Sequence, residues 1–380
     1  MKKLLVFFSA NKQTVSLESH ILELSKLGFD MYFLTSCEEG ILHKRLREKG
    51  IKCYTSPMQF SNSINTYIFN FFYVIYFIIR NQVNFVFPHL HTPCLISSFA
   101  QYFVSAKFIF FRHNSSVWNN QDLFNTDINK NERIVDSIIN RMAKKITVPS
   151  DGVKNYMITH ENVNASKIEV LHYMYDFSMY NEPSLEVVEK IREQYTCNLL
   201  LIMVSRMVKH KRHIIVLEAV NHLIKEGYDI KMLLLDEGPE LIKLKNYVRD
   251  NKLEKHVFFI GFVQNFIDYM QASDLLVQPS MTDASNSVAK EMGLLSKAIM
   301  VSEGVGDYSE YVVHGENGIL IPTINSKECI EKELKRIYNK EYDIISIGKK
   351  LRETIFDTFS KSKLEEEYIT FIKNNLLYNQ

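Results

Sequence analysis

The amino-acid sequence predicts an α/β protein made of two Rossmann-like, doubly wound domains that face a central cleft. Three observations predict this class. Short apolar runs alternate with helical patterns along the whole chain, a second series of such runs begins after Pro183, and 380 residues suffice for two or three domains of ordinary size. Strands that are separated by helices need crossover connections, and these indicate parallel sheets.

The elements of the first domain begin close to the amino terminus. The run at 4–8 follows MKK and resembles the start of a signal peptide, but it is short and polar residues follow at once. We therefore interpret it as a buried first strand. Further strands are expected at 31–35, 84–88, 107–111 and 145–149, with helices at 17–27, 40–49, 64–79 and 94–104.

The second domain repeats this alternation. The join near 176–196 contains Pro183 and a charged helix, and a last helix is expected at 361–375. The expected domain boundaries are 1–180, 181–358 and a tail helix in 359–380. Strands are expected at 198–205, 230–235, 256–261, 274–280, 298–303 and 318–322, with helices at 213–225 and 240–250.

The composition is that of a globular protein whose charges nearly cancel. There are 45 basic and 44 acidic residues, a formal net charge of +1, which argues against a nucleic-acid partner. The five cysteines are scattered and include no CxxC pair. They argue against a metal site or a disulfide framework and indicate a reducing, cytoplasmic compartment.

The segment 64–79, INTYIFNFFYVIYFII, is unusually apolar and aromatic. It is shorter than the roughly 20 residues that span a bilayer. Two interpretations remain open. The segment forms either a buried helix or a helix that lies partly in a membrane interface, where tyrosine and phenylalanine are well suited.

Functional residues are sought at the carboxyl ends of the strands, where doubly wound sheets bind their ligands. The first strand is followed by SANKQTVSLES rather than by GxGxxG. The dinucleotide-binding fingerprint is therefore absent from its expected place, which argues against a dehydrogenase.

Arg206 and Lys211 lie between the expected strand 198–205 and the helix after it. The start of a helix favours anions through its unpaired amides and its dipole. Two cations at that place suit a diphosphate, which arginine binds bidentately and lysine as a point charge. A solvated basic turn is the alternative.

Asp283 and Glu291 lie eight residues apart around a helix expected to start near Ser285. Asp283 falls in the turn and Glu291 about two turns into the helix, so both lie on a similar side. An acid in the turn suits a sugar, and an acid deeper in the helix suits ribose hydroxyls. The alternative is that Asp283 or Ser285 caps the helix and Glu291 is a surface residue. A phosphate would suit the backbone amides of Asn286, Ser287 and Val288.

Three histidines follow strands of the first domain: His89 and His91 after 84–88, and His113 after 107–111. Such places would line a domain crevice, although a single histidine there is more often structural. We take His113 as the candidate. No spacing of histidines, cysteines or acids indicates a metal.

These clusters, in this order, resemble glycosyltransferase family 4, the large group of retaining GT-B enzymes. The first half is similar more loosely, through SLESHILELSKLGFDMYFLT, HLHTP, FRHN and ITVPSDGVKNYM. Six segments over about residues 200–322 carry the resemblance: VSRMVKHKR, LLLDEGPE, VFFIGFV, YMQASDLLVQPS, DASNSVAKEMG and VVHGENGILIP.

The resemblance implies a role for each matching position. Arg206 and Lys211 would contact the donor diphosphate, without a metal. Asp283 would face the donor sugar as the first acid of the E-x7-E motif, and Glu291 would bind ribose hydroxyls. The tail helix would cross back to the first domain. The other implied contacts are the backbone of Asn286, Ser287 and Val288 with a phosphate, the backbone near Gly261 and Phe262 with the nucleobase, and His113 with the donor sugar.

The sequence departs from the family pattern at two places. Asp283 stands where the family has glutamate, which shortens the reach by one methylene and leaves the donor sugar open. The first loop lacks the family's glycine pair and has Gln13, Thr14 and Val15 instead. The residues expected on the acceptor side are Ser16, Glu18 and His91.

The expected function is transfer of a sugar from a UDP- or GDP-sugar to a hydroxyl, with retention of the anomeric configuration. A glycan or lipid-linked glycan acceptor in bacterial surface polysaccharide assembly is expected, with peripheral contact to the inner face of the membrane. Two alternatives stay open. One is a nucleotide-sugar epimerase or hydrolase of the same fold, and the other is a non-catalytic nucleotide-sugar-binding scaffold subunit.

Overall fold

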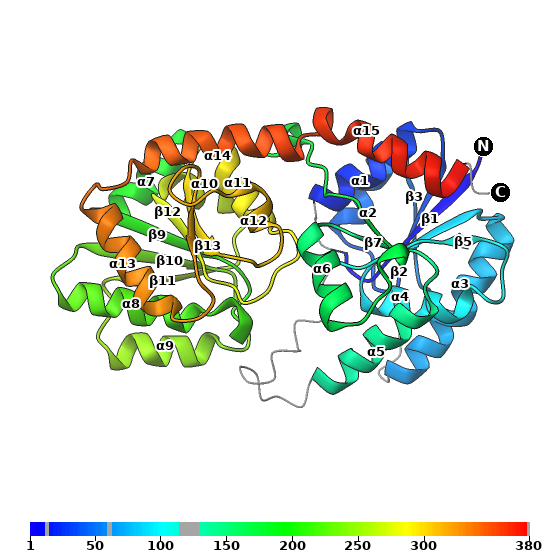
Figure 1. Cartoon of the computed structure of the whole chain (residues 1–380), viewed down its shortest axis with the longest axis horizontal. Helices are drawn as coiled ribbons and strands as arrows, with labels where there is room; N and C mark the ends of the chain where they lie inside the picture. The colour runs from blue at the N-terminus through cyan, green and yellow to red at the C-terminus, as the bar shows by residue number, and fades with distance from the viewer. Residues whose placement is uncertain (12–14, 59–62, 114–128, 378–380) are drawn as a thin grey trace. The chain divides into compact units, whose positions relative to one another are not determined.

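The computed structural model describes residues 1–11, 15–58, 63–113 and 129–377. The chain forms two compact units (Figure 1). Unit 1 comprises Met1–Asp176 together with Phe359–Gln380, and unit 2 comprises Phe177–Thr358. Each unit is an α/β domain with parallel strands, as the alternation in the sequence predicts.

The main sheet of unit 1 has five parallel strands in the order β3-β2-β1-β4-β5. The expected first strand is confirmed, because residues 4–7 of β1 are completely buried. The sequence did not predict β3, because three of its four residues face solvent or lie half-buried at the sheet edge, which leaves no apolar run. The strands are β1 (Lys3–Phe8), β2 (Asp30–Thr35), β3 (Lys52–Thr55), β4 (Phe85–Pro88) and β5 (Lys107–Phe108).

A second, three-stranded sheet of unit 1 corrects one expectation. A single strand was expected at 107–111, but the chain changes partners within it. The Ile109 amide donates to the Val86 carbonyl at 3.0 Å, whereas the next amide, that of Phe110, donates to the Lys145 carbonyl at 3.1 Å. The segment therefore splits into β5 and β6. The second sheet contains β6 (Phe110–Phe111), β7 (Ile146–Val148) and β8 (Ile168–Val170).

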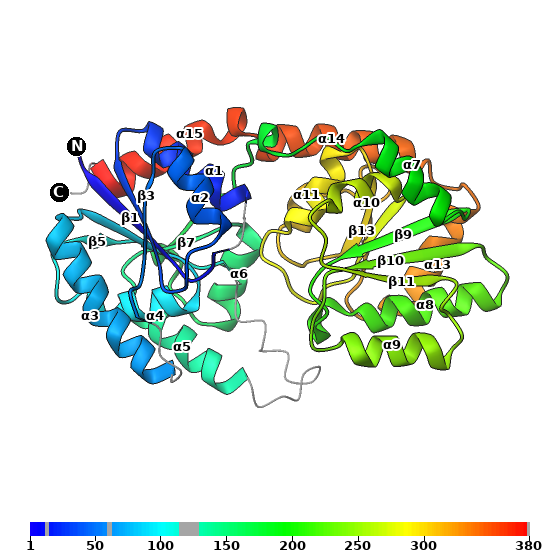
Figure 2. The same ribbon diagram turned by 180° about the vertical axis from the view of Figure 1, so that it is seen from behind.

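Helices lie on both sides of the sheets of unit 1 (Figure 2). The aromatic segment forms α3, which packs beside α4. Among the residues that the structure describes, no helix has both the length and the hydropathy that a membrane span requires. The helices of this unit are α1 (Val15–Lys26), α2 (Ile41–Glu48), α3 (Ser63–Asn81), α4 (His91–Ala100), α5 (Asn129–Met142), α6 (Asp151–His160) and α15 (Lys361–Ile372).

The tail of the chain packs into the core of unit 1. Tyr368 and Phe371 of α15 are buried in the same cluster as Leu4 of β1. The Tyr368 hydroxyl lies 3.0 Å from His20 Nδ1, and the Phe371 ring meets Phe87 edge to face. Residues that are far apart in sequence therefore share one core.

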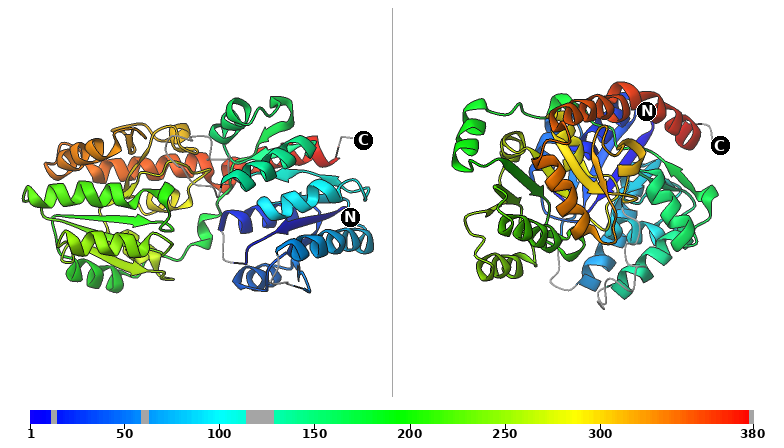
Figure 3. Two further views of the ribbon diagram at one scale, coloured as in Figure 1. Left: turned by 90° about the horizontal axis from the view of Figure 1, so that it is seen from below. Right: turned by 60° about the vertical axis from the view of Figure 1, so that its left-hand side comes forward.

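Unit 2 contains one parallel sheet of six strands in the order β11-β10-β9-β12-β13-β14, with helices on both faces (Figure 3). β12 lies beside β9 in the sheet, although α8, β10, α9, β11 and α10 separate these two strands along the chain. This reversal of strand order is the switch point at which such sheets bind ligands. The strands are β9 (Leu199–Val204), β10 (Ile230–Leu235), β11 (Val257–Gly261), β12 (Leu275–Gln278), β13 (Ala298–Ser302) and β14 (Ile319–Ile321).

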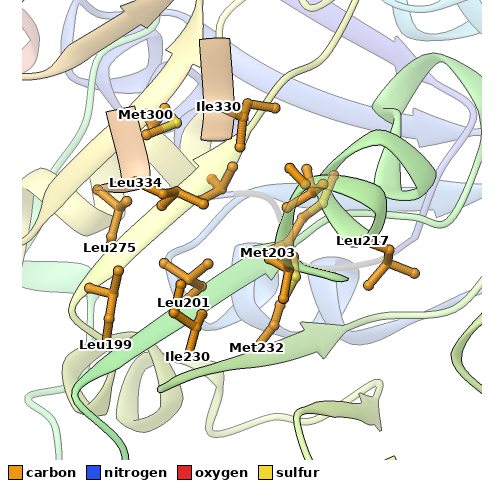
Figure 4. Close-up of a cluster of buried hydrophobic side chains, with 14 of the residues drawn as sticks. Leu199, Leu201, Met203, Leu217, Ile230, Met232, Leu275, Met300, Ile330 and Leu334 are labelled. Carbon is orange, nitrogen blue, oxygen red and sulfur yellow. The ribbon is translucent and has the colours of Figure 1, made fainter. Parts of the chain in front are cut away.

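Apolar side chains of this sheet and of the helices over it form the core of unit 2. Figure 4 shows Leu201 and Met203 of β9, Met232 of β10 and Leu217 of α8 in this cluster, all completely buried. Such a core holds the strand ends, and thus the loops that follow them, in fixed positions. The helices are α7 (Leu185–Gln194), α8 (His213–Lys225), α9 (Leu241–Asp250), α10 (Phe266–Ala272), α11 (Ser287–Leu294), α12 (Tyr308–Tyr311), α13 (Ser326–Tyr338) and α14 (Ile344–Phe359).

Candidate functional site

Loops that follow four neighbouring strands of unit 2 meet at the carboxyl end of its sheet. The loop after β9 is tied to the loop after β10, because the Met207 amide donates to the Glu237 carbonyl and the Glu240 amide donates to the Met207 carbonyl, each at 3.0 Å. The loop after β12 joins them through the Met281 amide, which donates to the His210 carbonyl at 2.8 Å. The candidate residues of separate motifs are thereby brought together.

Two glycines permit the loops to come this close. A Cβ at Gly238 would lie 2.4 Å from the Met207 carbonyl oxygen, which no side chain allows. Gly306, in the loop after β13, has a φ of +57°, and a Cβ there would lie 3.1 Å from the carbonyl oxygen of Asp283. The backbone at Gly306 therefore packs directly against the turn that carries Asp283.

Lys211 and Asp283 form the centre of the site. The Lys211 ammonium lies 2.7 Å from Asp283 Oδ2, and about 15% of each side chain is exposed. Burial would raise the pKa of Asp283, but the charge of Lys211 and hydrogen bonds from Lys211 and Asn286 outweigh it, so the pKa is lowered. Asp283 is therefore held as a carboxylate beside a cation.

The helix after Asp283 starts later than expected. α11 begins at Ser287, and Asn286 is its cap, with its side chain accepting from the Ala289 amide at 2.9 Å. The alternative in which Asp283 or Ser285 caps the helix is thus wrong. Asn286 also donates from Nδ2 to Asp283 Oδ2 at 2.7 Å. Ser287 and Val288 form the first helical positions, where backbone amides have no acceptor within the helix.

Glu291 is a buried residue of α11, so the alternative of a surface glutamate is wrong. The Tyr180 hydroxyl donates to Glu291 Oε1 at 3.0 Å. Burial raises the pKa of Glu291 to about 7, against the opposing effect of this hydrogen bond. The acid is therefore poised to change charge near neutrality, as acids of functional sites often are.

A buried ion pair lies beneath this turn. The Lys290 ammonium lies 2.7 Å from Asp307 Oδ2, and both side chains are almost completely buried. Lys290 also donates to Ser285 Oγ at 2.9 Å, and Ser285 donates to Asp307 at 2.6 Å. The pair connects α11 with the loop after β13 and fixes the residues between Asp283 and Ser287.

Three further candidates lie at strand ends of the same sheet. Arg206 follows β9 and is exposed. Gly261 ends β11 with a φ of +79°, and its carbonyl accepts from the Asp236 amide at 2.8 Å. The next side chain, that of Phe262, is 69% exposed. An exposed ring next to a glycine with positive φ is compatible with a flat ligand at this place.

His113 lies in unit 1 within a cluster of aromatic rings. Its Nε2 lies 2.8 Å from His89 Nδ1, and its Nδ1 contacts the Tyr173 hydroxyl. Burial and, to a smaller extent, the neighbouring His20 lower the pKa of His113 to about 3. The ring is therefore neutral, and both of its nitrogens are engaged within unit 1.

The candidates for the acceptor side have local partners. Glu18 is completely buried, and Arg45 Nε donates to its carboxylate at 2.9 Å. His91 Nε2 lies 2.9 Å from Asp136 Oδ1, and this hydrogen bond raises the pKa of His91. The side chain of Ser16 lies outside the described residues, as do Gln13 and Thr14.

Several residues of these sites were not singled out from the sequence. Tyr180 lies 111 residues before its partner Glu291, and Asp307 lies 17 residues after Lys290. The sequence offered one signal for the buried ion pair, which is that Lys290 stands among apolar residues of the helix after Asp283. Within the described ranges, no group of three or more histidine, cysteine or acidic residues has the arrangement of a metal site.

Comparisons with known proteins identify the family of both halves of the chain. The family model "Glycosyltransferase Family 4" matches residues 13–178, and the model "Glycosyl transferases group 1" matches residues 187–354. Together they cover the two units in chain order.

Two curated relatives and one solved structure illustrate the similarity. The N-acetyl-alpha-D-glucosaminyl L-malate synthase of Bacillus anthracis is 24% identical over 56% of this chain and 55% of its own length. The N-acetylgalactosamine-N,N'-diacetylbacillosaminyl-diphospho-undecaprenol 4-alpha-N-acetylgalactosaminyltransferase of Campylobacter jejuni is 22% identical over 57% of this chain and 56% of its own. This chain thus matches little more than half of each.

The crystal structure of HepE of Anabaena in complex with UDP-glucose superposes with a TM-score of 0.80 at 17% identity, over 98% of this chain and 100% of that one. Identity at this level establishes the fold alone. Because its two Rossmann-like domains superpose on this structure, the chain has the GT-B fold. Because the two family models match its two halves in order, the chain belongs to glycosyltransferase family 4.

Proposed function

We propose that this protein is a retaining glycosyltransferase that moves a hexose-type sugar from a UDP- or GDP-sugar to a hydroxyl of a glycan or lipid-linked glycan. One observation carries the proposal. A cation, a carboxylate and the start of a buried helix meet at the switch point of unit 2, in Lys211, Asp283 and α11. This combination suits a ligand that has both an anionic and a polyhydroxyl part.

The anionic part is the diphosphate of the donor. In the reaction the bond between the anomeric carbon and the phosphate oxygen breaks, and negative charge develops on that oxygen. Lys211, Arg206 and the first amides of α11 supply positive charge for it without a metal. The acceptor hydroxyl forms the new bond on the same face of the sugar, and its proton passes to the departing phosphate oxygen. The products are the glycoside and the nucleoside diphosphate.

The polyhydroxyl parts are the sugar and the ribose. The Asp283 carboxylate accepts hydrogen bonds from sugar hydroxyls, and its lowered pKa keeps it ionised for this task. Glu291 accepts from ribose hydroxyls beside Tyr180. The exposed ring of Phe262, next to Gly261, offers a face for the nucleobase.

The relatives support an acceptor of the glycan class. The name of the Campylobacter relative describes transfer to a sugar on diphospho-undecaprenol. We therefore assign this chain a lipid-linked or surface-glycan acceptor in bacterial polysaccharide assembly. The protein then works in the cytoplasm, with peripheral contact to the inner face of the membrane.

A thermal-shift screen of the full chain against UDP- and GDP-sugars tests the donor. A cognate donor at about one hundred times its Kd is expected to stabilise the protein by about 2.7 kcal/mol. The same donor is then incubated with glycan acceptors, and the anomeric configuration of the product is read by NMR. A product with the inverted configuration would overturn the retaining assignment.

The same experiment separates the two alternatives. An isomer or rapid hydrolysis from donor alone would identify an epimerase or a hydrolase. Donor binding without turnover over a broad acceptor panel would identify a scaffold subunit. Absence of any shift with all nucleotide sugars would contradict donor binding itself.

A further inference from the structure

Helix α3 of unit 1 carries an apolar stripe on the side that faces solvent. Its inner side is buried in the expected way, at Asn70, Val74, Phe77 and Ile78. The outer side is apolar as well, and five side chains there are between 50% and 64% exposed. They repeat every three or four residues, so they share one face of the helix. The stripe consists of Ile64, Ile68, Phe72, Tyr76 and Ile79.

The end of α4 extends this stripe. Phe99, Tyr102 and Phe103 are between 43% and 65% exposed. The Phe103 ring meets Phe71 of α3 edge to face at 5.6 Å, and Phe71 in turn lies 5.1 Å from Phe72. The two groups are thus continuous and form one apolar surface, which we call the α3–α4 surface. Figure 2 shows these two helices side by side in unit 1. A contiguous apolar surface of this kind marks an interaction site.

The charges around the α3–α4 surface indicate what it contacts. From Lys49 to Gln121 the sequence contains no aspartate or glutamate. Cations are present instead, near the end of the stripe. Arg80 follows Ile79 directly. The Lys107 amide donates to the Asn84 carbonyl at 2.9 Å, and Lys3 Nζ donates to the Asn81 carbonyl at 2.7 Å. Arg80, Lys107 and Lys3 thus gather around the loop that follows α3.

We propose that the α3–α4 surface inserts into the interface of an anionic phospholipid bilayer, with α3 lying parallel to the membrane plane. The stripe runs over about 22 Å at 1.5 Å per residue, which is too short to span the hydrocarbon core of about 30 Å but long enough to lie along its boundary. Tyrosine and phenylalanine are suited to that depth, and the adjacent cations contact lipid phosphates.

A second copy of this chain would also cover an apolar surface, but the charges favour lipid. Two copies of the same face would bring Arg80 and Lys107 of one protomer toward those of the other, without a carboxylate on the segment to balance them. An anionic bilayer provides the opposite charge. The proposal rests on the membrane contact in the proposed function and names the surface that makes it. Its test measures vesicle binding, whereas sugar transfer is tested with donor and acceptor in solution, so failure of the one is distinguished from failure of the other.

Sedimentation of the full chain with vesicles tests the apolar part. The protein is expected to sediment with vesicles of phosphatidylcholine and phosphatidylglycerol, less with phosphatidylcholine alone, and less again as salt is raised. The double variant Ile68→Asp/Phe72→Asp is expected to lose at least tenfold in affinity. Its matched control is Ile242→Asp, which changes a side chain that is 74% exposed in unit 2 and should bind like the parent.

Removal of the cations tests the electrostatic part. Arg80→Gln and Lys107→Gln are each expected to weaken binding to the anionic vesicles about fivefold. Their control is Lys225→Gln together with Lys349→Gln, which removes two exposed lysines of unit 2. An unchanged melting temperature shows that each variant remains folded.

Three outcomes would overturn the proposal. The first is absence of binding to the anionic vesicles. The second is loss of binding in the Ile242→Asp control to the same extent as in the double variant. The third is a parent protein that self-associates without vesicles and becomes monomeric in the double variant, which would make the surface a contact between two copies.

Discussion

The Lys211 ammonium and the Asp283 carboxylate lie 2.7 Å apart, so two residues that belong to separate sequence motifs form one ion pair. The sequence assigns Lys211 to a diphosphate and Asp283 to a sugar. In the proposed function, the ion pair lies where the anomeric carbon of the donor is bonded to its phosphate oxygen. It also keeps each charge compensated before a ligand arrives.

Replacement of Lys211 by alanine is expected to reduce turnover by two to three orders of magnitude. Without Lys211, no ammonium stabilises the negative charge that develops on the departing phosphate oxygen. Removal of one such group from a preorganised site raises the activation free energy by about 2.7–4 kcal/mol. Turnover is measured at saturating donor. Because Lys211 lowers the pKa of Asp283, the variant should also show a higher pKa for that acid.

Lys209→Ala is the control for this variant, since Lys209 lies in the same short helical turn and is exposed. It is expected to retain near-parental turnover. Equal losses in the two variants, or an unaffected Lys211→Ala enzyme, would remove Lys211 from the diphosphate site.

The sequence predicts the parts of this site that depend on local order along the chain. Lys211, Asp283 and Glu291 each follow a strongly apolar strand, and the carboxyl ends of parallel strands necessarily meet at one edge of the sheet. Their approximate neighbourhood therefore follows from the strand assignments alone. The expected tail helix at 361–375 likewise corresponds to α15, because its apolar residues recur at helical spacing.

Contacts between distant residues are not encoded in any local pattern. Nothing near Tyr180 indicates that its hydroxyl will meet Glu291, and the burial that raises the pKa of Glu291 arises only once the unit has folded. The same holds for the exchange of strand partners at Ile109, which depends on the positions of β4 and β7. Asn286 caps α11 instead of Asp283 or Ser285 because its side chain is the one that reaches the Ala289 amide, and this depends on the folded turn.

Removal of divalent metal is expected to leave the activity unchanged. The charge that develops on the diphosphate is balanced by Lys211, Arg206 and the start of α11 in the proposed reaction. Turnover is compared after dialysis against EDTA and after addition of Mg²⁺ or Mn²⁺. Loss of activity that returns on addition of metal would show that these groups are insufficient.

The buried pair of Lys290 and Asp307 is expected to dominate the stability of the turn that carries Asp283. Removal of one partner leaves an uncompensated buried charge, which costs about 3–5 kcal/mol. Lys290→Met or Asp307→Asn should each lower the free energy of unfolding in urea by this amount. The double variant should lose less than the sum, because no isolated charge remains.

Lys327→Met provides the comparison, since it breaks an ion pair with Glu331 in which the lysine side chain is 41% exposed. Surface pairs contribute about 0–1 kcal/mol. Single variants of the buried pair that cost no more than this one would contradict its role.

His113→Ala is expected to lower turnover by the same factor at every pH from mildly acidic to alkaline. The pKa of His113 is lowered to about 3, so the ring stays neutral throughout this range and its loss removes a hydrogen-bonding group, not a titrating one. The measurement is a pH–rate profile of both proteins. His160→Ala, at an exposed position of unit 1, should match the parent. A ratio that changes around pH 6.5, the ordinary pKa of histidine, would contradict the neutral ring.

Glu291 is expected to make donor affinity depend on pH near neutrality. Its pKa is about 7 in the folded protein, above the value of about 4.3 in an unfolded chain. Folding therefore favours the protonated form, and this contribution to stability is complete below about 4.3 and lost as the pH rises through about 7. In the proposed function, ribose hydroxyls donate to the Glu291 carboxylate, so affinity for a nucleotide sugar should rise as the pH rises through about 7.

Calorimetric titration with the cognate nucleotide sugar at a series of pH values checks this expectation. Glu291→Gln should bind more weakly at high pH and show no such pH dependence, whereas Glu316→Gln, at an exposed position, should follow the parent. Tyr180→Phe removes a hydrogen bond that lowers the pKa of Glu291, so its midpoint should move to higher pH. If the parent's affinity is constant across neutral pH, or if Tyr180→Phe shifts the midpoint downward, Glu291 is not the acid that holds the ribose.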